Sequence, residues 1–487
     1  MTGHNDPTGR YATRRAFLGR SSLGLGSVAL ASLLNPKALA GGPEPAAGAS
    51  AGFRGVVQPR HVPPKAKRVI FLYMSGGPSQ FETFDHKPEL ARLDGRPMPE
   101  SFTKGQPIAQ LQGSALKVLR PLAKFKRYGR SGQEISDFLP QIARHADDLC
   151  IIRSMQTDQI NHDPAHTVMN TGTAIQGRPS MGSWVTYGLG SESDDLPGFV
   201  VMTSDTPGGR SPQPISSRQW HSGFLPGHFQ GVEFRSGGDP VYYLGRPPGV
   251  SADGQRDVVD AVAGLNKIRD RALHSPEIAA RVAQYELAFR MQTSIPGLMD
   301  LSGESAETLD LYGVRGADGS FAANCLLARR LAERGVRFIQ LYHRDWDHHG
   351  DLTRYMTLCC RETDRASSAL LTDLKRLGML DETLVVWGGE FGRTPMFQGK
   401  GKDPGRDHHM RAFSMWLAGG GIKGGVTHGA TDELGYHAVE DRVHVHDLQA
   451  TILHLLGIDH KRLTYRYQGR DFRLTDVEGK VVTPILA

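Results

Sequence analysis

Residues 336–351 read VRFIQLYHRDWDHHGD, an apolar run that ends in three histidines and three aspartates. Six ionisable groups packed this closely would repel one another and lose solvation without a partner. A metal ion is the usual way to hold neutral imidazoles and carboxylates together. We interpret the stretch as a strand that delivers metal ligands to the rim of a sheet. The alternative is a solvated polar loop.

Other apolar runs without helical period extend this strand pattern along the chain. They lie at 67–74 (KRVIFLYM), 149–155, 198–202, 384–387 and 412–418, and each is typical of a strand buried on both faces. Helical patterns alternate with them at 135–146, 163–171, 255–273, 276–293, 320–334, 352–377 and 445–457. This alternation predicts an α/β fold, with a doubly wound, mostly parallel sheet and helices on both faces.

The chain of 487 residues is long enough for one large core or two ordinary ones. We expect a single domain over residues 65–487, preceded by a Gly-, Ala- and Pro-rich flexible leader at 41–64. Residues 203–255 are rich in Gly and Pro, and predict a loop-rich insertion that shapes a substrate cleft.

The N-terminal residues 1–40 resemble a twin-arginine export signal. Arg14 and Arg15 precede Phe17-Leu18, an apolar run follows at 23–34, and Ala38-Leu39-Ala40 has the pattern of a cleavage site. A membrane anchor is the alternative, but the run is short for a bilayer span. We therefore expect a periplasmic or extracytoplasmic protein with no stable membrane span after cleavage.

The charge balance excludes one class of partner. The formal net charge is +6, of which residues 1–40 carry about +4, so the remainder is only slightly basic. No nucleic-acid partner is expected. The four cysteines (Cys150, Cys325, Cys359 and Cys360) lack zinc-ribbon spacing, and leave one disulfide or buried free thiols as the alternatives.

Ionisable or small polar residues follow several of the predicted strands. They are Ser75, Ser79, Glu82 and Asp85; His162, Asp163 and His166; Asp345 and His349; Glu390 and Arg393; and, in a later loop, His408 and His409. Carboxyl ends of parallel strands share one edge of a sheet, where ligand sites form. This convergence favours the metal interpretation over the polar loop.

The order of these motifs resembles the alkaline phosphatase and sulfatase superfamily. Asp345-x-x-x-His349 is similar to the Asp-x-x-x-His that binds one metal in nucleotide pyrophosphatases and phosphoglycerate mutases. Gly389-Glu390-Phe391-Gly392 stands where the superfamily has Asp-His-Gly. His408 or His409 resembles the last histidine ligand, and residues 445–458 resemble the closing helix of sulfatases.

A narrower resemblance covers nearly all of residues 65–487. The segments GGPSQFETFDHKP, NHDPAH, WGGEFGRTP, GRDHH and YRYQGRDFRLTD resemble a group of twin-arginine-exported, sulfatase-like bacterial proteins classed as a domain of unknown function. The resemblance implies the fold and a metal held by Asp345, His349, Glu390 and His408 or His409. The metal would be Zn, Mn or Ca. One ion is expected, and a second ion is the alternative.

Two positions depart from the superfamily pattern. His162 stands where sulfatases have an oxidisable Cys or Ser and phosphatases a Ser or Thr, so it is a nucleophile, a ligand or a general acid. The carboxylate after the first strand is absent, and Ser75, Ser79, Glu82, Asp85 and Asp163 form a possible additional site. His166 and Arg393 would steady an anion.

Two functions are consistent with these residues. The first is an exported metal-dependent hydrolase of phosphate or sulfate esters, with a small or polymeric anionic ester as substrate. The second is a non-catalytic protein of the same fold that binds anionic glycans or a partner protein. A structural or storage site for metal is a third interpretation of the histidines. The sequence says nothing about the oligomeric state.

Overall fold

The computed structural model describes residues 54–487 except 206–211, 238, 243, 247–248 and 274–275. Within this part of the chain, nine strands form one sheet in the order β12-β4-β11-β8-β1-β7-β5-β6, with β15 also paired to β4. The strands are β1 (Arg68–Met74), β4 (Leu149–Gln156), β5 (Phe199–Thr203), β6 (Val232–Phe234), β7 (Phe338–His343), β8 (Thr383–Gly388), β11 (Phe413–Ala418), β12 (Val426–His428) and β15 (Val443–His444). Only β11 runs antiparallel to its neighbours, so the predicted mostly parallel sheet is confirmed.

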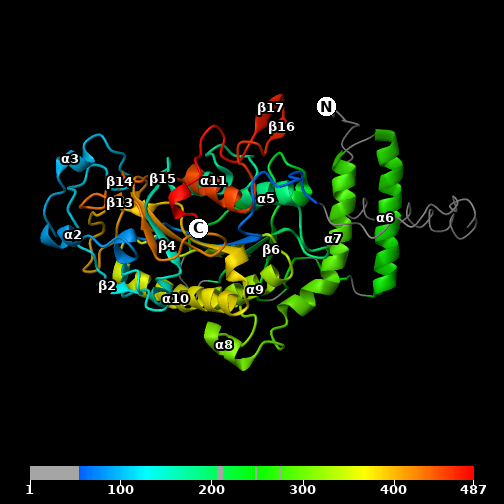
Figure 1. The fold of residues 1–487 in the computed structure, drawn as a ribbon, viewed down its shortest axis with the longest axis horizontal. Coiled ribbons are helices and arrows are strands. Elements are labelled where there is room, and N and C mark those ends of the chain that lie inside the picture. The colour runs from blue at the N-terminus through cyan, green and yellow to red at the C-terminus, as the bar shows by residue number, and fades with distance from the viewer. Residues whose placement is uncertain (1–53, 206–211, 238, 243, 247–248, 274–275) are drawn as a thin grey trace, which may run out of the picture. The chain divides into compact units, whose positions relative to one another are not determined.

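Helices cover both faces of this sheet (Figure 1). On one face lie α9 (Phe321–Glu333) and the 25-residue α10 (Leu352–Arg376), packed on side chains such as Ile70 and Leu341. On the other lie α4 (His162–Thr171), α5 (Met181–Leu189) and α11 (Val445–Leu455), packed on Phe71 and Phe338. Alternate residues of each central strand therefore enter different cores, which explains why the strands read as continuous apolar runs.

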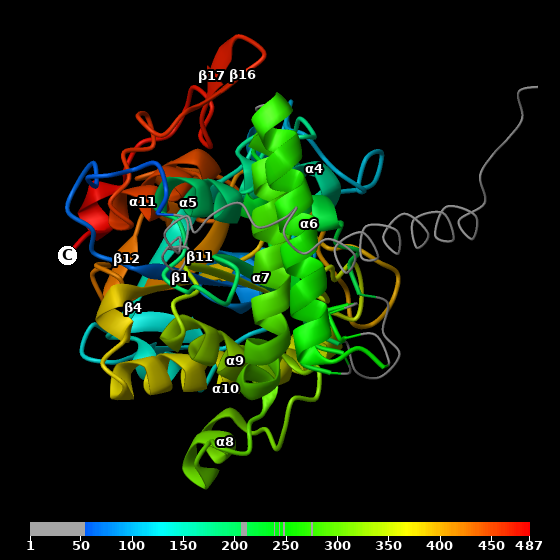
Figure 2. The ribbon, with the colours of Figure 1, turned by 90° about the vertical axis from the view of Figure 1, so that its right-hand side faces the viewer.

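Two long helices stand beside this core. α6 (Ala252–Leu273) and α7 (Pro276–Met299) pack side by side, as Figures 1 and 2 show. α8 (Ala306–Tyr312) follows them and contacts α9 and α10. None of the helices in the described ranges is both long and apolar enough to cross a membrane.

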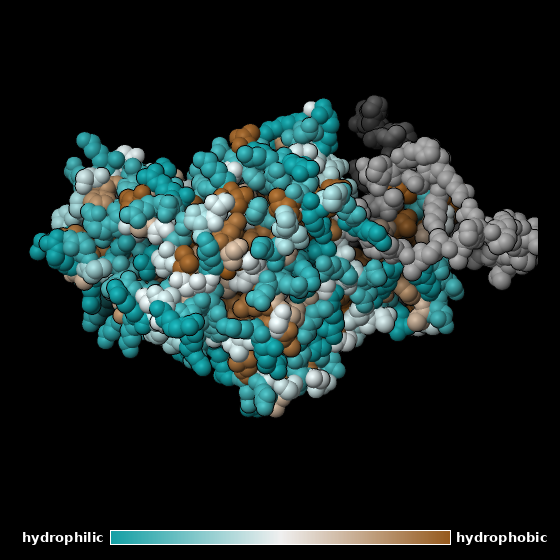
Figure 3. Space-filling view, in the orientation of Figure 1, coloured by the Kyte–Doolittle hydropathy of each residue, from teal (hydrophilic) through white to brown (hydrophobic). Residues whose placement is uncertain are grey.

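The remaining elements are short. They are the helices α2 (Pro88–Arg92) and α3 (Glu100–Thr103) and the strand pairs β2 (Phe125–Tyr128) with β3 (Gln133–Ser136), β9 (Gly392–Arg393) with β10 (His408–His409), β13 (Ala430–Thr431) with β14 (Ala438–Glu440), and β16 (Tyr465–Tyr467) with β17 (Arg470–Phe472). The face drawn in Figure 3 is mostly hydrophilic, with hydrophobic residues scattered over it.

The structure differs from three local predictions. The helix expected at 135–146 is the strand β3 followed by a short 3-10 turn at Ile142–His145, in which Ile142 and Ala143 are buried without a continuous helical face. The expected loops at 203–255 include β6, which pairs in parallel with β5 and extends the sheet. Residues 54–64 of the expected flexible leader pack on the domain, because Val57 is buried and donates its backbone N–H to Gly188.

The four cysteines are buried free thiols, which confirms that alternative to a disulfide. Residues 1–53 lie outside the described part of the chain, and with them lie the predicted export signal and the first part of the leader.

Candidate metal centre

The carboxylate of Asp347 lies at the centre of a histidine cluster beyond the carboxyl ends of β7 and β8. Its Oδ1 is 2.9 Å from Nε2 of His349 and 3.2 Å from Nε2 of His408. Its Oδ2 is 3.2 Å from Nε2 of His162, although that pair is not aligned as a hydrogen bond. Three imidazoles from three separate segments thus turn the same ring nitrogen toward one aspartate.

His408 has the proton arrangement of a candidate metal ligand. Its Nδ1 lies 3.0 Å from the backbone carbonyl oxygen of Ile160, which can only accept a hydrogen bond, so Nδ1 carries the proton. Burial lowers the pKa of His408 to about 4, with the charge of Arg393 acting in the same direction. The ring is therefore neutral at pH 7, and its Nε2 lone pair faces the lone pairs of the Asp347 carboxylate.

His349 repeats this pattern. Its Nδ1 lies 2.6 Å from Oε1 of Gln398, and the amide nitrogen of Gln398 is committed to Gln110. The Gln398 oxygen is therefore the acceptor, and Nδ1 of His349 is the donor. Gln110 also directs its own amide nitrogen at Nε2 of His349, 3.1 Å away, which requires a lone pair at that atom.

His162 is held by a second carboxylate. Its Nδ1 donates to Oε1 of Glu390 at 2.7 Å, which leaves Nε2 turned to Asp347. Burial alone would lower the pKa of His162, but the carboxylates of Asp347 and Glu390 outweigh burial and raise that pKa. Without a metal, a proton would therefore take the place of the cation at this nitrogen.

These four residues fit a metal ion. One ligand atom from each of His162, Asp347, His349 and His408 lies within 4.8 Å of the other three. Ligands at about 2.0–2.1 Å from a tetrahedral ion lie roughly 3.4 Å apart, so small side-chain adjustments would suffice. A metal-binding histidine usually donates its other ring N–H to a carboxylate or a carbonyl group, as all three rings here do.

Arg393 holds the aspartate in place. It is almost fully buried, and its guanidinium donates to Oδ1 of Asp347 at 2.7 Å and to the carbonyl oxygens of Gly76, Gly77, Trp346 and Arg406. Although burial raises the pKa of Asp347, the charge of Arg393 holds that pKa well below its usual value. Arg393 is therefore occupied inside the protein and does not steady an external anion as predicted.

Glu390 and His166 form the layer beneath His162. Glu390 is fully buried, and the backbone N–H of Gly76 donates to both of its oxygens at 3.0 and 3.2 Å. Gly76 has a φ of 117°, and a Cβ there would lie 2.5 Å from the backbone nitrogen of Asp347, so glycine is required at this contact. Glu390, His162 and His166 also offer ligand atoms within 4.8 Å of one another.

His166 faces the sheet and not the cluster opening. Its Nδ1 lies 2.8 Å from the hydroxyl of Tyr73, and its Nε2 lies 3.3 Å from Oγ of Ser75. Burial lowers the pKa of His166 to about 4. The side chains of His166, Tyr73 and Ser75 are all buried, so they support the site from the side of the sheet.

Two predicted ligands lie elsewhere. Oδ2 of Asp345 lies 3.9 Å from Sγ of Cys359 in α10, and its backbone oxygen accepts from the same Sγ and from Nε2 of His348. The backbone is irregular after β7, so sequence spacing does not decide which aspartate reaches the cluster. Nε2 of His409 bonds to the backbone oxygen of Tyr436. Neighbouring residues of a strand point to opposite faces, and in β10 it is His408 that meets the cluster.

The possible additional site after β1 is a set of internal contacts. Ser79 donates to Glu82, and Glu82 forms a fully buried ion pair with Arg406 at 2.8 Å. Asp85 pairs with Lys87 at 3.0 Å and accepts from Thr431. Asp163 pairs with Arg218 at the first turn of α4, and the N-cap of that helix is Asn161.

Asp347 was not among the ligands predicted from the sequence, yet Asp347 is the residue that the three histidines share. No spacing rule would have selected Asp347 over Asp345. Arg393, five positions after the end of β8, is the clue that the structure supplies, because a buried arginine needs an anionic partner.

The cluster opens beside a lysine-bearing loop. Residues 399–405 run past His349, since Gln398 pairs with Gly405 and Gly350 pairs with Pro404. This loop carries two exposed lysines, Lys400 and Lys402. Asp347 and His349 are about one-quarter exposed, which leaves the centre reachable from this side.

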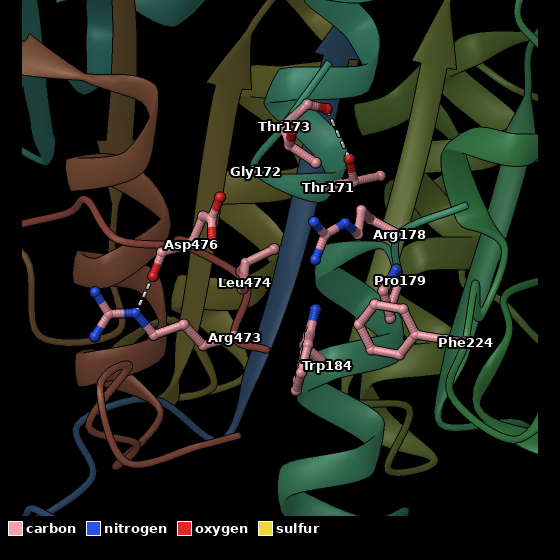
Figure 4. Close-up of a pocket in the computed structure, with 10 residues that line it drawn as sticks. All are labelled: Thr171, Gly172, Thr173, Arg178, Pro179, Trp184, Phe224, Arg473, Leu474 and Asp476. Carbon is pink, nitrogen blue, oxygen red and sulfur yellow. Dashed lines mark hydrogen bonds between the residues drawn. The ribbon is translucent and has the colours of Figure 1, made fainter. Parts of the chain in front are cut away.

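A small hollow lies at the far end of α4 (Figure 4). It is lined by Thr171, Gly172, Arg178, Trp184, Phe224 and Arg473, among others. The ten residues of α4 separate it from His162 by about 15 Å. Gly172 ends the helix with a φ of 75°, and a Cβ there would lie 1.8 Å from the carbonyl oxygen of Leu474.

A family model described as "Protein of unknown function (DUF1501)" matches residues 66–486. The comparison with curated proteins finds no match.

Several solved structures are similar at low identity. The lipoteichoic acid synthase LtaP from Listeria monocytogenes is 10% identical, with 81% of this chain and 73% of that chain covered and a TM-score of 0.35. The PsFucS1 sulfatase from Pseudoalteromonas sp. is 11% identical, with 80% and 68% covered and a TM-score of 0.32. Alkaline phosphatase from the Antarctic bacterium TAB5 is 11% identical, with 80% and 98% covered and a TM-score of 0.30. At these TM-scores the likenesses carry no functional inference.

Proposed function

The chain belongs to the DUF1501 family, and we propose that it is an exported, metal-dependent hydrolase of phosphate or sulfate esters. One observation carries the proposal. His162, His349 and His408 each donate a proton outward from Nδ1 and turn Nε2 on the carboxylate of Asp347. A divalent cation would bind these ring nitrogens and neutralise the charge of the carboxylate together.

The ligand set favours zinc among the metals considered. Three imidazole nitrogens and one carboxylate suit Zn, whereas Ca takes six to eight oxygen ligands. A divalent ion held there would supply Lewis acidity to an ester oxygen and to water. Glu390 orients His162, and Arg393 fixes Asp347, so both act as positioning residues.

Water is the nucleophile that this site can use. His162 stands at the N-terminus of α4, but its Nδ1 is bonded to Glu390 and its Nε2 is turned to Asp347. In the proposed centre this Nε2 would bind the metal ion, so the ring would hold no nitrogen free for covalent attack. Lys400 and Lys402 would attract the anionic ester to the open side of the centre.

The test measures metal and turnover together. Elemental analysis of the purified protein should find about one zinc ion per chain. The same protein should hydrolyse an aryl phosphate or an aryl sulfate. Asp347→Ala should abolish both, while Lys400→Ala/Lys402→Ala should raise KM with kcat nearly unchanged. Protein that purifies without metal, yet hydrolyses either ester at the full rate, would refute the proposal.

A non-catalytic binding protein is the second candidate. The observation that favours it is that His162, whose Nδ1 is bonded to Glu390, stands where the resemblance to sulfatases and phosphatases would place the nucleophile. In that case, metal-loaded protein would bind an anionic glycan or a partner protein and turn over neither aryl ester. Glycan binding that disappears in Asp347→Ala would support it.

Export by the twin-arginine route is the remaining part of the proposal, and it rests on the sequence of residues 1–40. Arg14→Lys/Arg15→Lys should retain the protein in the cytoplasm of a bacterial host. Cell fractionation followed by immunoblotting measures this. Unchanged recovery from the periplasm would contradict twin-arginine export and leave the metal centre untouched.

A further inference from the structure

One face of α6 carries exposed hydrophobic residues in a regular row. Val258, Leu265 and Ile268 are 55%, 49% and 64% exposed, and Ala261 between them is exposed as well. We define Val258, Ala261, Leu265 and Ile268 as the α6 stripe. Their spacing of three, four and three residues places them on one side of the helix, as at the seam of a coiled coil.

The opposite side of α6 is already covered. Val259 is buried, and Arg256 reaches across to α7, where it pairs with Glu286 at 3.0 Å and lies over the ring of Phe289. Figure 2 shows the two helices packed along most of their lengths. The α6 stripe therefore points away from α7. Among the described residues, this helix leaves its most regular apolar row without a packing partner.

The charges of α6 are divided between its two halves. The N-terminal half contains Asp253, Asp257 and Asp260 with a single basic residue, Arg256, which is paired with Asp260. The C-terminal half contains Lys267, Arg269 and Arg271 with a single acidic residue, Asp270. A helix that is acidic at one end and basic at the other complements an antiparallel copy of itself.

We propose that the α6 stripe is the interface of a two-fold symmetric homodimer, in which α6 packs antiparallel to α6 of a second copy. A two-fold axis at the middle of the stripe sets Val258 opposite Ile268 and Ala261 opposite Leu265. The same axis sets Asp257 opposite Arg269, and both of these residues are exposed in the single chain. Each pair occurs twice, as an isologous interface requires.

The centre of the stripe permits close approach. Ala261 and Gly264 lie next to the axis, and small residues there let two helices approach at roughly 8–10 Å. A single pair of 22-residue helices is a small interface, so we expect a dissociation constant on the order of micromolar. A parallel arrangement would bring the acidic halves together and is disfavoured by repulsion.

Sedimentation velocity of the full chain over roughly 1–100 μM tests this. Wild type should pass from monomer to dimer across the range. Leu265→Asp should weaken association at least about 10-fold. Ile175→Asp is the matched control, because Ile175 is 63% exposed and lies outside α6; it should associate as wild type does. Far-UV circular dichroism verifies that both variants are folded.

A charge exchange tests the antiparallel register. Asp257→Arg and Arg269→Asp should each weaken the dimer, because each creates two like-charge contacts. The double variant Asp257→Arg/Arg269→Asp should restore it, since the pairs are reversed but intact. Wild type that stays monomeric throughout, or a double variant as weak as the single ones, overturns the proposal. Monomeric wild type that binds anionic vesicles through Leu265 would assign the stripe to a membrane surface instead.

Discussion

Nδ1 of His162 lies 2.7 Å from the buried carboxylate of Glu390, so the imidazole ring is fixed with Nε2 turned outward. Glu390 is in turn held by the backbone N–H of Gly76, at the end of the neighbouring strand β1. A carboxylate that no solvent reaches thus sets the direction of a ring that is part of the open centre. The following predictions test this division of roles.

Asp347, and not Asp345, should bind the metal. We expect Asp347→Ala to lose nearly all bound metal, because it removes the only carboxylate of the four-residue group. Asp345→Ala should retain at least half, since Oδ2 of Asp345 contacts Sγ of Cys359 and the residue is not one of the four. Elemental analysis of both purified variants gives the answer. Metal lost from Asp345→Ala alone would reverse the assignment.

Glu390→Gln should weaken metal binding by about 10- to 100-fold without unfolding the protein. The amide has one acceptor oxygen for the N–H groups of Gly76 and His162, and its NH₂ meets one of these donors. Competition with a zinc indicator measures the affinity. Glu382→Gln, a change of an exposed glutamate, serves as the control. Equal affinities in the two variants would mean that Glu390 does not orient His162.

The buried pair of Glu82 and Arg406 should dominate the stability of the adjoining loops. Both side chains are fully buried, so Glu82→Ala leaves an unpaired guanidinium and should cost about 3–5 kcal/mol of unfolding free energy. The exposed pair of Lys67 and Glu382 is the comparison, and Glu382→Ala should cost less than about 1 kcal/mol. Urea titrations at pH 7 measure both. Similar losses in the two variants would contradict this ranking.

Acid should destabilise the fold through His409. Burial lowers the pKa of His409 to about 4, so the folded state keeps the ring neutral while the unfolded chain takes up a proton below about pH 6.5. This contribution is present above pH 6.5 and is lost as the pH falls toward 4, at about 1.4 kcal/mol per pH unit. His409→Gln keeps a donor for the carbonyl of Tyr436 and removes the titration.

Urea titrations with a chelator at pH 7.5, 6 and 5 make this comparison. Wild type should lose more unfolding free energy than His409→Gln between pH 6 and pH 5. Parallel losses in the two proteins would show that His409 does not contribute to the acid response.

The fold was predictable because its central strands are continuous apolar runs in the sequence. Residues 384–387 and 412–418 are apolar on both faces, and strands of this kind in alternation with helices permit few architectures. The direction of β11 was not predictable, since burial on both faces gives an antiparallel strand the same pattern. The helix expected at 135–146 does not form, because a short 3-10 turn is enough to bury Ile142 and Ala143.

The sequence predicted which segments form the candidate site, but not which side chain of each segment enters it. Every expected segment reaches the sheet edge, because parallel strands end there. Which side chain enters the cluster depends on irregular backbone after β7 and on the two-residue strand β10. There, one step along the chain exchanges His408 for His409. Arg393 was assigned to an external anion, because a sequence does not reveal that four backbone carbonyls already surround its guanidinium.

The four ligands come from α4, from the turn after β7 and from β10, segments that are distant in the chain, while the four cysteines form no cross-link. A single ion at Asp347 would therefore cross-link segments that are far apart in the chain, a role that no disulfide fills here. Protease resistance would then depend on metal supply. A cell short of that metal would lose the protein to degradation before its activity became limiting.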